Sequence, residues 1–273
     1  EADADEASVR RLCDDLNVPL TVGKGDVPAA AAAQGDGLEA AAREARYEFL
    51  TQAAHEHGAR FVATAHTADD QAETILHRIL RGTGVAGLAG MAIARPLSPA
   101  VSLVRPMLAA TRRHVLAYLA ERGIAFREDA SNRDVTLTRN RLRHELLPLL
   151  RSGYNGEVDA ALLRLGALAA ECQKVIDALV DDLQRRAVVC ERDQAIVHCD
   201  ALAGQAPYVV RELLMALWRQ HDWPQQPMSF QHWQDLAATA QSGPALWRLW
   251  RRDLPGGVRA EKKGEQLVLT RPC

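Results

Sequence analysis

Apolar residues recur every three to four positions in several parts of the chain, which predicts amphipathic helices there. The clearest case covers residues 69–81. One side of that helix is apolar and carries Ala72, Ile75, Leu76, Ile79 and Leu80. The opposite side is polar and carries Asp70, Glu73, Thr74, His77 and Arg81. We therefore expect this helix to have a core face and a face available for chemistry.

The same periodicity predicts further helices, and shorter apolar runs predict strands. The other expected helices cover residues 3–16, 38–57, 111–122, 138–150, 157–186 and 207–221. The expected strands cover residues 19–22, 60–65, 103–107 as an edge strand, a hairpin at 187–189 and 195–199, and 266–270.

The order of these elements predicts an α/β fold, because helices that alternate with strands favour a parallel sheet covered by helices. We expect residues 1–150 to form a partial Rossmann-like parallel sheet with flanking helices, including a linker helix at 126–150. Residues 151–273 then form a mainly helical second domain with a small β element.

Polar residues gather where the strand at 60–65 meets the helix at 69–81. Ligands of open α/β sheets collect at the carboxyl ends of strands, and His66, Asp69 and Asp70 lie at that end. Acidic residues in a first turn are also ordinary helix caps. Capping does not explain Glu73 and His77 further along the same stripe, so we interpret the stripe as functional. His66 and Asp69 alone are too few ligands for a zinc site.

A second polar stripe lies on the helix predicted at 138–150. Its apolar side carries Leu142, Leu146 and Leu149. Its other side carries Arg139, Asn140, Arg143 and His144. Arginines in this arrangement can bind a phosphate backbone, or they can form a solvated face, and spacing alone does not decide between the two.

The segment Gly82-Thr83-Gly84-Val85-Ala86-Gly87 fits the G-x-G-x-x-G pattern of dinucleotide binding. That pattern must follow a strand, whereas this one follows a helix. The context argues against a nicotinamide site, and we expect Gly82 to end the helix in a left-handed conformation.

Composition narrows the class of protein. Hydrophobic residues make up 48% and charged residues 25% of the chain, and no apolar run approaches the ~18 residues of a membrane span. The net charge of −2 excludes a globally basic nucleic-acid binder, so any such contact must be local. The five cysteines show no C-x-x-C spacing, which argues against a zinc ribbon and favours the reducing cytoplasm.

Two long motifs resemble those of the bacterial tRNA(Ile)-lysidine synthetase family, ATP-pyrophosphatase-type enzymes of the adenine-nucleotide α-hydrolase-like fold. They occupy residues 65–91 and 127–148. Asp-Asp-Gln-x-Glu-Thr at 69–74 also occurs elsewhere in that superfamily, but its pairing with Thr-Arg-Asn-x-x-Arg-His-Glu-Leu-x-Pro at 138–148 is more specific. Similar segments at 104–108 and 254–258 extend the resemblance over nearly the whole chain.

The sequence departs from the family pattern in several places. Ala65, Thr67 and Ala130 stand where the family usually has glycine, histidine and proline. The family's phosphate loop, Ser-Gly-Gly-x-Asp-Ser, does not occur in the sequence. We therefore expect an N-terminally truncated chain that begins after this loop and is inactive by itself.

The resemblance implies a reaction and its participants. ATP adenylates O2 of the wobble cytidine of a tRNA(Ile) with a CAU anticodon, and the ε-amine of free L-lysine then displaces AMP at C2. The implied catalytic residues are His66, Asp69, Asp70 and Glu73, with Asp70 and Glu73 also as Mg²⁺ ligands. The implied ATP contacts are Thr64, Ala65 and His66. The implied tRNA contacts are His77, Arg81, Arg105, Arg139, Asn140 and Arg143. We expect no membrane partner, and a homodimer is a further hypothesis.

Two alternatives stay open. A tRNA-thiolating enzyme of the same superfamily shares the acidic helix, but such enzymes generally need cysteines, and Cys13 is the only one in the first 171 residues. A catalytically inactive tRNA-binding protein is the other alternative, because the phosphate loop is missing from the sequence.

Overall fold

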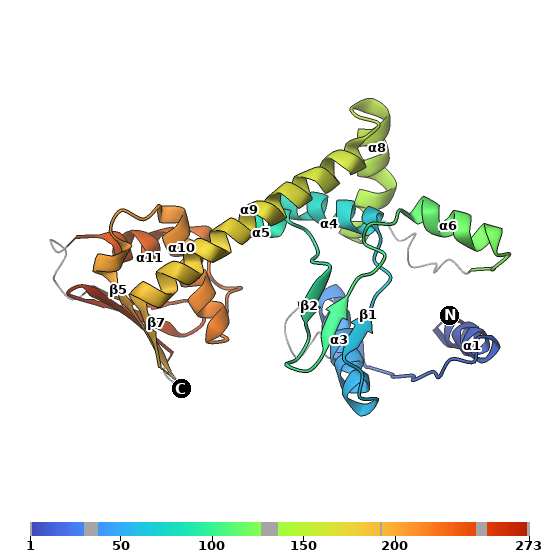
Figure 1. Cartoon of the computed structure of the whole chain (residues 1–273), viewed down its shortest axis with the longest axis horizontal. Coiled ribbons are helices and arrows are strands. Elements are labelled where there is room, and N and C mark those ends of the chain that lie inside the picture. The colour runs from blue at the N-terminus through green and yellow to red at the C-terminus, as the bar shows by residue number, and fades with distance from the viewer. Residues whose placement is uncertain (1, 30–37, 127–135, 192, 244–249, 272–273) are drawn as a thin grey trace. The chain divides into compact units, whose positions relative to one another are not determined.

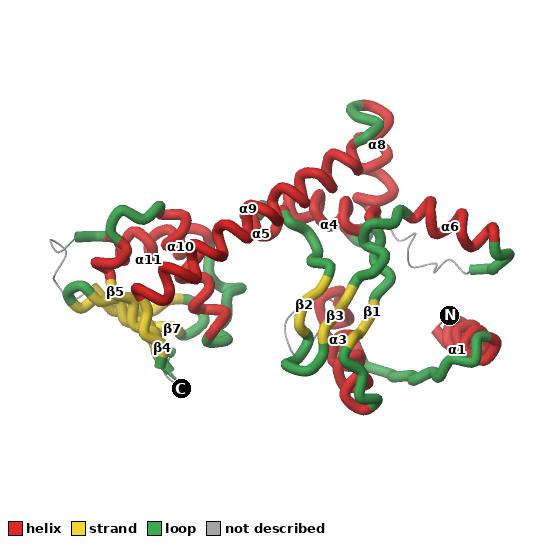
Figure 2. The backbone as a smooth tube through the Cα atoms, viewed as in Figure 1, coloured by secondary structure: helices red, strands yellow, loops and turns green. Residues whose placement is uncertain are grey.

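The chain divides into two compact units in the computed structural model, which describes residues 2–29, 38–126, 136–191, 193–243 and 250–271 (Figure 1). Unit 1 consists of Glu1–Gly82 and Gly90–Arg164, and unit 2 of Thr83–Ala89 and Leu165–Cys273. Each unit has its own sheet (Figure 2).

Unit 1 contains a three-stranded sheet with the order β1-β3-β2. Its strands are β1 (Phe61–Ala63), β2 (Ala94–Pro96) and β3 (Ser102–Val104). β1 and β3 are parallel, and β2 is antiparallel to β3. The helices that begin in this unit are α1 (Ala2–Asp15), α3 (Leu38–Glu56), α4 (Ala68–Arg81), α6 (Arg112–Glu121), α7 (Thr138–Arg141), the π-helical turn η2 (Leu142–Leu146), α8 (Leu147–Gly153) and α9 (Val158–Ala187).

Two strand predictions in this unit were wrong. The strand expected at the edge is β3, which lies between the other two because β2 pairs with its far side. Residues 19–22 form no strand. Pro19 has no N–H to donate to a ladder, and no described strand pairs with that segment.

Two apolar clusters hold unit 1 together. Ala54 of α3 packs with Val62, Val101 and Leu103 of the sheet region. The core face of α4 packs against the η2 and α8 region in a second cluster, formed by Ala72, Ile75, Leu76, Leu142, Leu147 and Leu162. This second cluster places the polar face of α4 beside α7 and η2. Ile79 and Leu80, expected in the core, are exposed at the end of α4.

The helix over 138–153 is not regular. The π-helical turn η2 inserts extra backbone, which shifts the buried face by one or two positions. Leu142 and Leu147 are therefore buried, whereas Leu149, expected on the apolar side, is 55% exposed. Residues 127–135, where the second motif begins and where Ala130 stands, lie outside the described residues.

Unit 2 contains a five-stranded antiparallel sheet with the order β4-β5-β8-β7-β6. Its strands are β4 (Val188–Cys190), β5 (Gln194–His198), β6 (Trp250–Leu254), β7 (Val258–Lys263) and β8 (Gln266–Thr270). Its helices, besides most of α9, are α5 (Val85–Leu88), the 3-10 turn η3 (Cys199–Leu202), α10 (Pro207–Gln220) and α11 (Phe230–Gln241). Trp218 lies at the centre of this unit. Its ring makes edge-to-face contacts with Trp223 and with Trp233, and the ring centroids are 5.0 Å apart in each pair.

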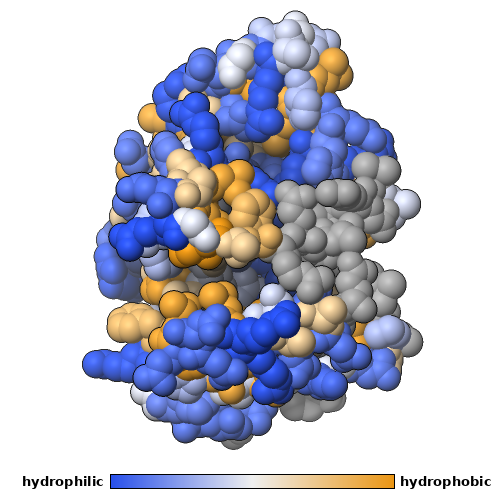
Figure 3. All heavy atoms as spheres, turned by 90° about the vertical axis from the view of Figure 1, so that its right-hand side faces the viewer, coloured by the Kyte–Doolittle hydropathy of each residue, from blue (hydrophilic) through white to orange (hydrophobic). Residues whose placement is uncertain are grey.

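The predicted fold class is confirmed: a small parallel sheet with flanking helices precedes a largely helical region with a small sheet. No helix among the described residues is long and apolar enough to cross a bilayer. On the face drawn in Figure 3, hydrophobic residues form patches among hydrophilic ones.

Candidate active site

The loop between β1 and α4 fixes the first polar residues of the site. The Thr64 N–H donates to the Val104 carbonyl at 3.0 Å, which continues the parallel pairing beyond β1. Thr67 then caps α4. Its N–H and its hydroxyl donate to Oδ2 of Asp70 at 2.8 and 2.9 Å. This capping holds Asp70 in one orientation and leaves its other oxygen, Oδ1, for a different partner.

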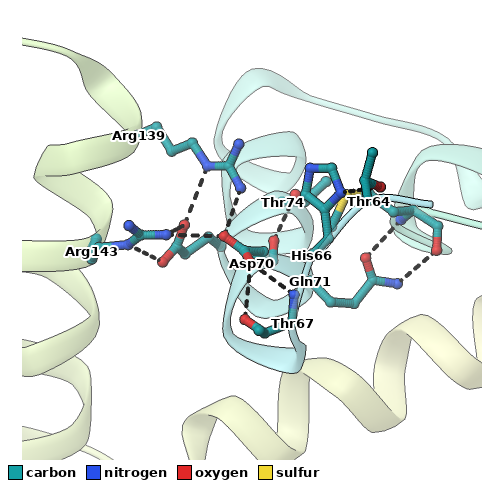
Figure 4. Close-up of polar contacts among 10 residues, drawn as sticks. Thr64, His66, Thr67, Asp70, Gln71, Thr74, Arg139 and Arg143 are labelled. Carbon is teal, nitrogen blue, oxygen red and sulfur yellow. Dashed lines mark hydrogen bonds and ion pairs between the residues drawn. The ribbon is translucent and has the colours of Figure 1, made fainter. Parts of the chain in front are cut away.

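Asp70 and Glu73, here called the acid pair, bind Arg139 and Arg143, here called the arginine pair (Figure 4). Oδ1 of Asp70 accepts from Nη2 of Arg139 at 3.2 Å and from Nη2 of Arg143 at 3.0 Å. Oε2 of Glu73 accepts from Nε of Arg139 at 3.3 Å and from Nη2 of Arg143 at 2.9 Å. Oε1 of Glu73 accepts from Nε of Arg143 at 2.5 Å.

The charges of this cluster are balanced and partly shielded from solvent. Glu73 is only 2% exposed. Burial raises the pKa of Asp70, but the Thr67 hydrogen bonds and the charges of Arg139 and Arg143 outweigh it and lower the pKa overall. The hydrogen bonds to Glu73 raise the pKa of Arg143 above its ordinary value. Asp70 and Arg143 therefore stay ionised at neutral pH.

His66 lies in the same loop and is neutral at pH 7. Its Nδ1 lies 2.9 Å from the hydroxyl oxygen of Thr64. Burial lowers the pKa of His66, and the positive charges of Arg105, Arg139 and Arg43 lower it further, against the opposing effect of Asp70. A neutral imidazole can accept or donate a hydrogen bond at the carboxyl end of β1.

Asp69 has a different partner from the acid pair. Its Oδ2 accepts from the backbone N–H of Arg112 at 2.7 Å, at the N-terminus of α6. Asp69 therefore caps α6 and links it to α4. The structure does not join Asp69 to the cluster by any hydrogen bond or ion pair recorded between described residues.

The other expected tRNA contacts differ in exposure. Arg105 is 2% exposed, and its Nη1 donates to the Ala92 carbonyl at 2.6 Å. Asn140 directly follows Arg139 in α7, and its side chain is buried. His77 is half-buried and Arg81 is exposed, one and two turns beyond Glu73 on α4. Arg139 and Arg143 both form ion pairs with the acid pair.

One contact of α4 was not predicted. The Gln71 side chain forms two hydrogen bonds with the backbone of Met91, from the Met91 N–H at 2.7 Å and to the Met91 carbonyl at 3.1 Å. The neighbouring Gly90 has a φ of 71°, and a Cβ there would lie 2.6 Å from the Gln71 amide. Gln71 falls inside the Asp-Asp-Gln-x-Glu-Thr motif, which is the signal that could have identified it. Gly82 does have the expected positive φ, at 76°.

Comparison with known proteins decides the family. The model of the PP-loop domain matches residues 1–150. The tRNA(Ile)-lysidine synthase of Rhodopirellula baltica is 34% identical over 98% of this chain and 76% of its own length. The chain belongs to the tRNA(Ile)-lysidine synthase family.

Other tRNA(Ile)-lysidine synthases match this chain with similar identity, but over a smaller share of their own length. The Geobacter sulfurreducens protein is 41% identical over 78% of this chain and 44% of its own length. The Chromobacterium violaceum protein is 38% identical over 82% of this chain and 48% of its own length. The chain thus spans about half the length of these two relatives.

The membership confirms the resemblance found in the sequence, and the structure joins its two motifs. The acid pair comes from the first motif of the tRNA(Ile)-lysidine synthase family and the arginine pair from the second. PP-loop enzymes use ATP, so ATP is a substrate in the reactions of this family.

Proposed function

We propose that the protein makes lysidine in tRNA(Ile). In this reaction ATP adenylates O2 of the wobble cytidine of a CAU anticodon, and the ε-amine of free L-lysine displaces AMP at C2. The observation that carries the proposal is the contact between the acid pair and the arginine pair. It supports the proposal because it brings two carboxylates and two guanidinium groups together near the carboxyl end of β1.

The acid pair supplies the charge that a lysine substrate needs. Two ionised carboxylates attract the lysine ammonium groups and orient the amine for attack. Because the pKa of Asp70 is lowered, this carboxylate is a weak general base at neutral pH, which favours binding over proton abstraction. In the absence of lysine, the arginine pair neutralises the two carboxylates and occupies their oxygens, so a lysine ammonium group has to displace arginine hydrogen bonds to bind there.

The arginine pair is the proposed contact with the tRNA backbone. Arg139 and Arg143 use Nε and Nη2 for the acid pair, and no bond is recorded for their Nη1 groups among the described residues. Their side chains are 35% and 25% exposed, so these groups can reach a phosphate. Arg81 and His77 extend the same face along α4. The burial of Asn140 and Arg105 favours roles in positioning this face.

The β1–α4 loop is the proposed contact with the nucleotide. Thr64, Ala65 and His66 lie at the carboxyl end of β1, where parallel sheets bind ligands. The neutral His66 ring can bond a nucleotide without adding charge. Asp69 supports this loop indirectly, because it holds α6 against the start of α4.

The acid pair does not fit Mg²⁺ in its observed arrangement. Every oxygen of Asp70 and Glu73 accepts a hydrogen bond from Thr67 or from the arginine pair. No group of three or more potential ligands occurs among the described residues. We therefore derive no step through a metal held by these two residues.

A homodimer through α9 is the proposed assembly. Exposed apolar side chains recur along α9 with spacings of three and four, at Leu165, Leu168, Cys172, Val175 and Leu179. This spacing is typical of the seam of a two-helix coiled coil. A Leu168→Glu variant should reduce the mass measured by light scattering from dimer to monomer, and an unchanged mass would exclude this seam.

The test of function is product formation. The gene product, with any residues that its reading frame encodes before Glu1, is incubated with tRNA(Ile) transcript, ATP and lysine. Lysidine should appear in the digested nucleosides, and a transcript with uridine at the wobble position should give none. Folded protein that binds the transcript but transfers no lysine would support the inactive binder, and sulfur incorporation would support a thiolating enzyme.

A further inference from the structure

The arginine pair covers the acid pair from solvent. Each carboxylate oxygen that does not bond Thr67 accepts from a guanidinium group of the arginine pair (Figure 4). The side chain of Glu73 is 3% exposed and that of Asp70 19%. The arginine pair forms the outer layer, with side chains that are 35% and 25% exposed. An ammonium group from solvent therefore cannot bond Glu73 while the arginine pair keeps this position.

The covering side chains can move without disturbing the core. Arg139 lies on α7 and Arg143 on η2, and the buried side chains of Leu142 and Leu147 hold this region against α4. Because this apolar contact fixes the backbone, the arginine pair can leave the carboxylates by rotation about side-chain bonds alone. The acid pair then becomes exposed while α4 and η2 stay packed.

A lysine ammonium group and the arginine pair compete for the same oxygens. Both donate to carboxylates, and both oxygens of Glu73 are already bonded by Arg143. An arginine that gives up a carboxylate in this partly buried position needs another anion, because an unpaired charge there is costly. A phosphate group is a matching replacement, since guanidinium groups bond phosphate oxygens in the same two-pronged geometry.

We propose that the contact between the two pairs is a latch, which closes the lysine site until the tRNA backbone binds the arginine pair. The proposal rests on the proposed function, which assigns lysine to the acid pair and RNA phosphates to the arginine pair. Phosphates of the bound RNA draw Arg139 and Arg143 away from the carboxylates. Glu73 then becomes accessible to an ammonium group, so the bound RNA opens the lysine site.

The latch makes the binding of lysine and the binding of RNA mutually favourable. Thermodynamic linkage requires that RNA raises the affinity for lysine by the same factor by which lysine raises the affinity for RNA. Such coupling factors are typically about 5–150. Free lysine therefore binds mainly to protein that already holds its RNA, and the acid pair stays neutralised in protein that does not.

Lysine titrations with and without RNA measure this coupling. Calorimetry is carried out on the gene product alone and at saturation with the anticodon stem-loop of tRNA(Ile), in the absence of ATP so that no lysine is consumed. The stem-loop should lower the dissociation constant of lysine about tenfold. Glu73→Gln should remove most of this gain, because the carboxylate that the open latch uncovers is no longer there.

Removal of either arginine should imitate the RNA. Arg139→Gln and Arg143→Gln should each bind lysine about tenfold more tightly than the unaltered protein in the absence of RNA, and the stem-loop should then raise the affinity for lysine by less. Arg141→Gln is the matched control, since Arg141 is an exposed cation of α7 whose partner is Glu145. It should bind lysine as the unaltered protein does. Circular dichroism checks the fold of each variant.

The latch and the proposed function can fail separately. The latch is overturned when lysine binds with the same affinity with and without the stem-loop, or when Arg143→Gln binds lysine no more tightly than Arg141→Gln. Lysidine formed by the same protein in that case leaves the proposed function intact. Coupled binding of lysine and stem-loop, with no lysidine formed once ATP and tRNA(Ile) are added, supports the latch and contradicts the proposed function.

Discussion

Arg143 and Glu73 form a two-pronged contact across 70 residues of sequence, from Nε to Oε1 at 2.5 Å and from Nη2 to Oε2 at 2.9 Å. Glu73 is almost completely buried, so this contact joins the two family motifs inside the protein. Its geometry is the bidentate form that gives arginine–carboxylate pairs their strength.

The free energy of this contact can be measured by a double-mutant cycle. Glu73→Gln, Arg143→Gln and the double variant should give a coupling energy of about 1–3 kcal/mol from urea unfolding, because each single change leaves a partly buried charge unpaired. The control cycle uses Arg141 and Glu145, which are exposed and 3.8 Å apart. That pair should couple by less than about 0.5 kcal/mol. Equal coupling in the two cycles would show that the Arg143–Glu73 contact adds no stability.

Removal of a phosphate contact should flatten the salt dependence of tRNA binding. We expect Arg139→Ala and Arg143→Ala each to reduce the slope of log K against log salt by roughly one, because one fewer counterion is released. Arg141→Ala, on the same helix, should keep the slope of the unaltered protein. A full slope in the Arg139 and Arg143 variants would limit the arginine pair to a structural role.

Asp69 should act as a helix cap. Asp69→Ala removes the acceptor for the Arg112 N–H, and we expect it to lower the free energy of unfolding by about 1 kcal/mol. Asp69→Asn retains a capping oxygen and should lose less. Calorimetric or urea unfolding of the two variants compares them, and equal stability of Asp69→Ala and the unaltered protein would contradict the cap.

The lowered pKa of Asp70 predicts a loss of stability in acid. Because its folded pKa lies below its unfolded pKa, Asp70 contributes its full stabilisation above pH of about 4. That contribution is lost as the pH falls through the lower pKa that Asp70 has in the folded protein. The urea midpoint of the protein should therefore fall more steeply below this pH than that of Asp70→Asn. Parallel curves would mean that Asp70 is not held in its ionised form.

The sequence predicted local structure well where that structure depends on a single helix or a single turn. The periodicity of residues 69–81 predicted α4, and Gly82 has the expected positive φ. β2 was missed because Ala94-Arg95-Pro96 has no alternation and becomes a strand only by pairing with β3. The π-helical turn η2 also has no sequence signal, and it moved burial from Leu149 to Leu147.

The site was predicted as a set of residues but not as a set of contacts. Asp70, Glu73, Arg139 and Arg143 were all identified, yet spacing could not show that they bind one another, because tertiary packing of α4 on η2 brings them together.

Incorporation of labelled lysine into tRNA(Ile) by the gene product and its Asp70→Asn and Glu73→Gln variants tests the central claim most directly. The account predicts that both variants keep the fold, by circular dichroism, and lose lysine incorporation by about 100-fold or more, as for a group that binds the reacting substrate. Undiminished incorporation by both variants would contradict it.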